Sequence, residues 1–113
     1  MEYSHKIEAE VLCLKLTGDL IGGSFAEELL ALVDQSIQEG NGNCSIDIEE
    51  VRYINSSGIG ALITVLTKLR NRGGDLVLIN PSEHVQKLLI MTKLENIFNI
   101  AASENEAFQL LNN

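Results

Sequence analysis

The sequence has few of the residues on which several classes of protein depend. Its 113 residues include one proline, two histidines, no tryptophan, and 8 basic against 16 acidic residues, for a formal net charge of −8. Binding to nucleic acid or to an anionic membrane surface requires a basic face, so this balance argues against both. The nearest basic group is Lys68, Arg70 and Arg72 at the end of a predicted helix, where positive charge suits the helix C-terminus.

Long apolar runs are also missing. None approaches the roughly 18–20 residues that cross a bilayer, and the polar N-terminus does not resemble a signal peptide. We therefore expect a cytoplasmic protein without direct membrane binding. Its two cysteines, Cys13 and Cys44, form no CxxC pair and lie in apolar, strand-like segments. In a reducing compartment such cysteines usually act as small core residues.

Signatures of enzymes are absent from the sequence. It contains no nucleophile elbow, Walker loop, dinucleotide fingerprint or zinc-protease motif. The two histidines, His5 and His84, are far apart in the chain, and their spacing indicates neither a serine triad nor a metal site. We expect no catalytic residues, metal or cofactor, and a protein that is not an enzyme.

The composition is that of a globular domain. With 45% apolar residues in 113, the chain suits a single domain over residues 1–113 with a core of Leu, Ile and Val. Alternating apolar residues predict strands, and apolar stripes at helical spacing predict helices. The strands are expected over 4–8, 11–16, 44–48 continuing to 54, 75–80 and 97–101, and helices begin near residues 24, 56, 82 and 103. This order predicts an α/β fold, with a mixed, mostly parallel sheet of about four to five strands packed against about four helices.

Serines are expected to cap three of the helices. Ser24 with Glu27, and Ser103 with Glu106, have the spacing of a capping box. Ser82 follows the proline that ends a strand and can cap the third helix.

One segment joins a strand to an amphipathic helix and contains two serines and two glycines, Asn55-Ser56-Ser57-Gly58-Ile59-Gly60. Capping alone needs one of its polar residues, and each glycine costs the helix about 1 kcal/mol relative to alanine. Close approach by another surface or by the adjacent strand would compensate for that cost. A second interpretation is a phosphorylation switch, because a phosphate on a serine at a helix N-terminus meets unpaired backbone N–H groups.

This segment resembles the signature of STAS domains, the fold of bacterial anti-sigma factor antagonists, which is commonly Asp-Ser-Ser/Thr-Gly-Leu-Gly. The resemblance covers almost the whole chain. Residues 11–20 resemble the family's second strand and following loop, residues 72–78 its later Gly-Gly strand, and residues 85–98 its third helix and last strand.

The resemblance implies a mechanism. The unphosphorylated antagonist binds an anti-sigma factor that is also a serine kinase, and this frees a sigma factor. Phosphorylation releases the antagonist, and a PP2C-type phosphatase resets it. Ser56 matches the phosphoacceptor, and Ser57 is the second candidate. The expected partner-binding residues are those of the motif and of the loops that follow neighbouring strands: Asp19, Leu20, Asn55, Ser56, Ser57, Gly58, Ile59, Gly60 and Ser82.

Two positions depart from the family pattern. Asn55 stands where the family usually has Asp, and Ile21 where many members have a second acid. These departures favour an alternative, a STAS interaction module whose binding ignores phosphorylation, such as a stress-complex scaffold or a regulatory subunit on the ATPase of an ABC lipid transporter. A small enzyme or nucleotide-binding protein built on Ser56 and the glycines is a third possibility, although it lacks a base and a Walker lysine.

Overall fold

A computed structural model describes residues 1–21 and 23–112 of the chain. These residues form five strands and four helices in the order β-β-α-β-α-β-α-β-α, as the sequence predicts. The strands are β1 (Glu2–Glu8), β2 (Val11–Leu20), β3 (Asn43–Ile54), β4 (Leu76–Ile79) and β5 (Asn99–Ala101). The helices are α1 (Ser24–Gln38), α2 (Ser56–Arg70), α3 (Glu83–Met91) and α4 (Glu104–Leu111).

The five strands make one sheet in the order β1-β2-β3-β4-β5. β1 is antiparallel to β2, and the pairs β2–β3, β3–β4 and β4–β5 are parallel. The prediction of a mixed, mostly parallel sheet with four helices is therefore confirmed. Because β2, β3 and β4 are parallel, their carboxyl ends meet at the same edge of the sheet.

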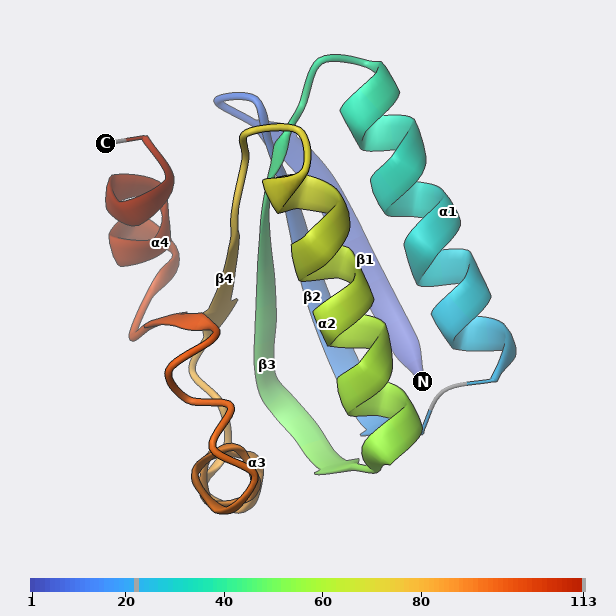
Figure 1. Ribbon diagram of the computed structural model, residues 1–113, viewed down its shortest axis with the longest axis vertical. Coiled ribbons are helices and arrows are strands. Elements are labelled where there is room, and N and C mark those ends of the chain that lie inside the picture. Colours follow the sequence, from blue (N-terminus) through green and yellow to red (C-terminus); the bar gives the residue numbers. More distant parts are fainter. Residues whose placement is uncertain (22, 113) are drawn as a thin grey trace.

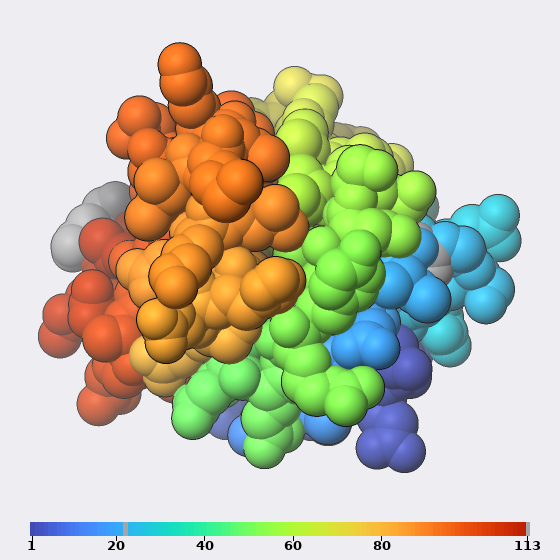
Figure 2. Space-filling view, turned by 90° about the horizontal axis from the view of Figure 1, so that it is seen from below, coloured from blue at the N-terminus to red at the C-terminus, as the bar shows by residue number. Residues whose placement is uncertain are grey.

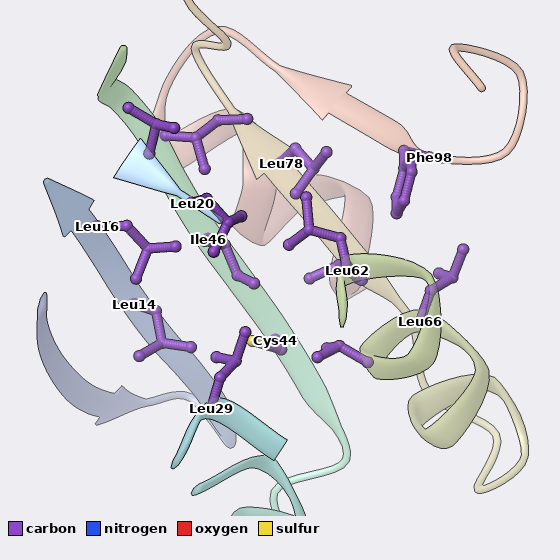
Figure 3. Packing of buried hydrophobic residues seen from close by; sticks show 14 of the residues in the cluster. Leu14, Leu16, Leu20, Leu29, Cys44, Ile46, Leu62, Leu66, Leu78 and Phe98 are labelled. Carbon is purple, nitrogen blue, oxygen red and sulfur yellow. The ribbon is translucent and has the colours of Figure 1, made fainter. Parts of the chain in front are cut away.

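Helices cover the two faces of the sheet unequally. α1 and α2 lie side by side on one face, whereas α4 lies beside β4 and β5 (Figure 1). The main apolar cluster fills the space between the sheet and α1, α2 and α3, with leucines of β2 and β4 directed toward α2 (Figure 3). A smaller cluster holds α4 on the opposite face, through Val77, Ile79, Ala101 and Ala107. β4 is buried on both faces, as its continuous apolar run predicts.

Both cysteines are part of the packed interior. Cys13 and Cys44 are free thiols with buried side chains, on β2 and β3. Burial raises the pKa of each thiol, which keeps it protonated near neutral pH. Their predicted role as small core residues is confirmed.

The first helix does not begin as the sequence predicts. The capping box of Ser24 and Glu27 is wrong, because Gly23 is the N-cap, with φ 71°, and no side chain caps the helix. The backbone carbonyl of Gly23 instead accepts a hydrogen bond from the N–H of Ala26 at 3.1 Å. Ser82 and Ser103 do cap α3 and α4, accepting from the backbone N–H groups of Val85 and Glu106.

The turn between β1 and β2 is strained. Its two central residues, Ala9 and Glu10, have φ of 52° and 62°, the left-handed region that asparagine and glycine occupy more easily. Replacing the pair by Asn-Gly is expected to raise the free energy of unfolding by about 1 kcal/mol, measured by urea denaturation. Glu39→Gly is the control, because Glu39 has φ −85° and a glycine there brings no such gain. An Asn-Gly variant with an unchanged or lower urea midpoint would contradict the expectation.

Candidate functional site

The predicted site residues gather where α2 begins. The end of β2, the end of β3, the first turn of α2 and the loop before α3 meet at the carboxyl edge of the parallel strands. Figure 2 shows this end of the molecule, with the start of α2 (green) between the residues that follow β4 (orange) and the end of β2 (blue). The backbone N–H of Asn55 donates to the carbonyl of Leu20 at 3.3 Å, which ties β2 to the segment before α2.

Asn55 is the residue that caps α2. Its side-chain Oδ1 accepts from the backbone N–H of Gly58 at 2.8 Å, and its backbone carbonyl accepts from the N–H of Ile59 at 2.9 Å. Its side-chain Nδ2 donates to the carbonyl of Ile21 at 3.3 Å. The capping function that the sequence leaves open between asparagine and serine therefore belongs to Asn55.

Ser56 and Ser57 are the first two residues of α2, and both are exposed. Since Asn55 is the cap, neither hydroxyl serves in that role. The backbone N–H groups of Ser56 and Ser57 lie in the first turn and have no acceptor within the helix. The first turn of α2 contains no acidic residue. An anion carried by Ser56 would therefore meet backbone donors and the positive end of the helix dipole.

The two glycines of the motif have different environments. A Cβ on Gly58 would lie 2.2 Å from the backbone oxygen of Leu20, so the end of β2 approaches the helix too closely for any side chain. A Cβ on Gly60 would meet nothing within 4 Å, and Gly60 is exposed. The packing of α2 against β2 thus requires a glycine at position 58. Packing does not require one at position 60, where Gly60 leaves the backbone of α2 exposed on the surface.

Three of the predicted partner-binding residues are buried, and their contact with a partner stays a prediction. Leu20 is 0% exposed and Ile59 8% exposed, because both side chains belong to the main apolar cluster. Gly58 is buried against β2. The side chains of Leu20 and Ile59 pack in the core beneath the site, and the backbone of Gly58 makes the close contact with β2.

An exposed ion pair and an aromatic pair lie at the ends of β2 and β3. Asp19 forms an exposed ion pair with Arg52, whose Nη2 lies 3.4 Å from Asp19 Oδ2, and its predicted contact with a partner stays a prediction. Tyr53, paired in register with Asp19, stacks on His84 of α3 with ring centroids 6.1 Å apart. The sequence analysis did not place Arg52, Tyr53 or His84 at this edge. The only signal was that Arg52 and Tyr53 lie shortly before Asn55, where the motif begins.

Ser82 also lies at this edge, but its hydroxyl is already used. Its Oγ donates to the carbonyl of Val51 at 3.1 Å and accepts from the N–H of Val85 at 3.3 Å. Ser82 is partly buried and fastens the start of α3 to β3. Its predicted contact with a partner stays a prediction.

Other kinds of site have little support among residues 1–21 and 23–112. No group of three or more His, Cys, Asp and Glu side chains there could hold a metal ion, and no helix there is long and apolar enough to cross a membrane. The basic residues at the end of α2 are partly neutralised, since Lys68 pairs with Asp34 at 3.1 Å and Arg70 with Asp75 at 3.2 Å.

Comparison with known proteins identifies the family. The STAS domain family matches residues 3–107, so the chain belongs to the STAS domain family. The anti-sigma-B factor antagonist of Bacillus subtilis is 29% identical over 83 residues, which cover 74% of this chain and 72% of that protein.

Solved structures share the fold over nearly the full length. A crystal structure from Thermotoga maritima matches 98% of this chain and 95% of its own, with a TM-score of 0.87 and 23% identity. The Bacillus cell fate determinant SpoIIAA, in its phosphorylated form, matches 96% of this chain and 98% of its own, with a TM-score of 0.75 and 22% identity.

Proposed function

We propose that this protein is an anti-sigma factor antagonist controlled by phosphorylation of Ser56. In its unphosphorylated form it binds an anti-sigma factor through the exposed surface around the start of α2, and so frees a sigma factor. Phosphate on Ser56 releases the complex. The protein acts by binding, in the cytoplasm, and residues 1–113 work as a single domain.

One observation carries the proposal. Ser56 is exposed at the first position of α2, while Asn55 provides the helix cap. The hydroxyl is thus accessible and has no capping role that modification would destroy. Curated relatives support the same function, since the matched Bacillus subtilis protein is named an anti-sigma-B factor antagonist. The matched SpoIIAA structure is described as a phosphorylated form, and it shares the fold.

The geometry explains how the phosphate can act without unfolding the protein. A phosphoserine carries about −1.5 to −2 charges, and the N–H groups of Ser56 and Ser57 are placed to receive them. The fold of α2 therefore tolerates the modification. The surface changes much more, because a partner that covers Ser56 must then desolvate a dianion.

The proposed partners are those that the resemblance to STAS domains implies. We propose that the anti-sigma factor is itself the serine kinase, so that it modifies the protein to which it is bound. A PP2C-type phosphatase restores the unphosphorylated form. Ser57 is adjacent and also exposed, and it is the second candidate phosphoacceptor.

Affinity capture from the native cytoplasm tests this function. The baits are the wild-type protein, Ser56→Ala and Ser56→Glu, with Gln109→Glu as a control that adds the same charge on an exposed position of α4. Bound proteins are identified by mass spectrometry. We expect a serine kinase with an anti-sigma factor activity to be retained by the wild type, Ser56→Ala and Gln109→Glu, and to be depleted with Ser56→Glu.

A different pattern would support the alternative module. If an ABC-transporter ATPase or another STAS protein is retained equally by all baits, binding ignores phosphorylation and the proposed switch is wrong.

A further inference from the structure

Asn55 connects two parts of the site that are distant in sequence. Two of its hydrogen bonds reach the last residue of β2 and the residue after it, from its backbone N–H to the Leu20 carbonyl and from its side-chain Nδ2 to the Ile21 carbonyl, each at 3.3 Å. Two others go to the first turn of α2, at Gly58 and Ile59. The residue directly before the phosphoacceptor therefore also holds the segment that leaves β2.

This double attachment depends on the amide group. The side chain must accept from Gly58 and donate to the Ile21 carbonyl at the same time, and an amide has one oxygen and one NH₂ for these tasks. An ionised aspartate has the same shape and can still cap the helix, but it has no donor. Its second oxygen would face the carbonyl of Ile21, and two acceptors repel each other.

Ile21, the residue held by this bond, presents a large apolar side chain to solvent. It is 55% exposed, directly after Leu20, which is fully buried. Burying an isoleucine side chain at an interface contributes about tenfold or more to affinity. The backbone carbonyl of Ile21 is bonded to Asn55, the residue directly before Ser56, so the bond restrains the backbone that carries this side chain. A restrained contact loses less entropy on binding than a mobile one.

We propose that Asn55 is a positioning residue that joins Ile21 and the Ser56 segment into one docking surface, in which Ile21 is the specificity-determining contact for an apolar pocket on the anti-sigma factor. The identity of this partner rests on the proposed function, whereas the positioning by Asn55 rests on the hydrogen bonds alone. Asn55 and Ile21 are the two departures from the family pattern, and in this proposal they act together.

A measurement without any partner tests the positioning. In Asn55→Asp at neutral pH, we expect the backbone order parameter of Ile21 from ¹⁵N relaxation to fall. The backbone amide of residue 55 should exchange with solvent about tenfold faster. Its hydrogen bond to Leu20 opens more often once the adjacent side-chain bond to Ile21 is gone. The amides of Gly58 and Val85 should stay as they are, since both caps remain. Unchanged order at Ile21 in Asn55→Asp would overturn the positioning role.

Two further variants separate charge from the loss of the donor. Asn55→Ser keeps a neutral helix cap, but the serine side chain is shorter and carries only one polar atom. It cannot cap α2 and hold the Ile21 carbonyl together, so Ile21 should become more mobile, as in Asn55→Asp. Asn96→Asp adds the same charge at an exposed position elsewhere and should leave Ile21 unchanged. If Asn55→Ser retains the wild-type order at Ile21, the amide donor is not what holds it.

A double-mutant cycle tests the docking surface. The affinity of the captured anti-sigma factor is measured by calorimetry for the wild type, Asn55→Asp, Ile21→Ala and the double variant. We expect each single variant to bind about tenfold more weakly, and the double variant to lose no more than about threefold beyond Ile21→Ala, because Asn55 acts through Ile21. Additive losses, or an Ile21→Ala variant with wild-type affinity, would overturn the role of Ile21.

The relaxation experiment and the double-mutant cycle test separate parts of the proposal. If no anti-sigma factor binds the wild-type protein, the proposed function and the docking role of Ile21 fall together, while the relaxation data still decide whether Asn55 positions Ile21.

Discussion

Replacing Gly58 by alanine is expected to destabilise the protein by at least about 3 kcal/mol, which lowers its melting temperature by roughly 12 °C or more. The new Cβ would lie 2.2 Å from the Leu20 oxygen and 3.0 Å from the side chain of Ile54. The oxygen belongs to the backbone of β2 and cannot move without disturbing the sheet. Thermal and urea denaturation followed by circular dichroism measure the loss.

Gly60→Ala is the matched control, in the same helix two residues away. Nothing lies within 4 Å of the new Cβ, so the better helix propensity of alanine should stabilise the protein by about 0.5–1 kcal/mol. The larger Gly60→Gln should also fold, but it should weaken binding to the anti-sigma factor if that partner approaches the bare backbone. A Gly58→Ala variant as stable as Gly60→Ala would show that the contact between β2 and α2 is looser than described.

Phosphate on Ser56 is expected to weaken binding to the anti-sigma factor by about 100-fold or more. A partner that covers the start of α2 must strip water from a dianion that already has donors on its own helix, and this costs several kcal/mol. Ser56→Glu carries one charge and no tetrahedral group, so its effect should be smaller, about 10- to 100-fold. Calorimetric titration of each purified form with the partner gives these ratios.

Controls for this effect are available in the same chain. Gln109→Glu should bind like the wild type, and Ser56→Ala should bind within about threefold of it, since a small exposed hydroxyl contributes little. The fold should survive, with a melting temperature for the phosphorylated form close to that of the unmodified one. Equal affinity of the phosphorylated and unphosphorylated forms would rule out the switch.

Much of the fold can be predicted from local pattern. The alternation of apolar and polar residues in 11–16 and the apolar stripe of α1 each indicate which face of the element is buried. The parallel direction of most strands follows from the alternation of strands and helices along the chain. The details of element ends cannot be read in the same way. The strand predicted from 11 to 16 continues to Leu20, and its pairing with β3 shifts register twice, between Lys15 and Thr17 and between Gly18 and Asp19. Such irregularities depend on the neighbouring strand.

The sequence indicates which segment forms the site, but not the contacts that shape it. The two serines before glycine pointed to the start of α2, and the structure places both at its surface. The sequence did not indicate that Gly58 faces the Leu20 carbonyl, or that Asn55 bonds to Ile21, because these contacts join residues more than 30 positions apart. For the same reason, the exposure of Ile21 and the burial of Leu20 become visible only in three dimensions.

The most direct test of the central claim is phosphorylation of the purified protein by its captured kinase, followed by site mapping and binding. The wild-type protein is incubated with the kinase and ATP, the modified residue is located by mass spectrometry, and both forms are titrated against the kinase. We predict one phosphate on Ser56, none on the Ser56→Ala variant, and a loss of affinity that a PP2C-type phosphatase reverses. A protein that binds the kinase but remains unmodified, or that keeps its affinity when Ser56 is phosphorylated, would contradict the account.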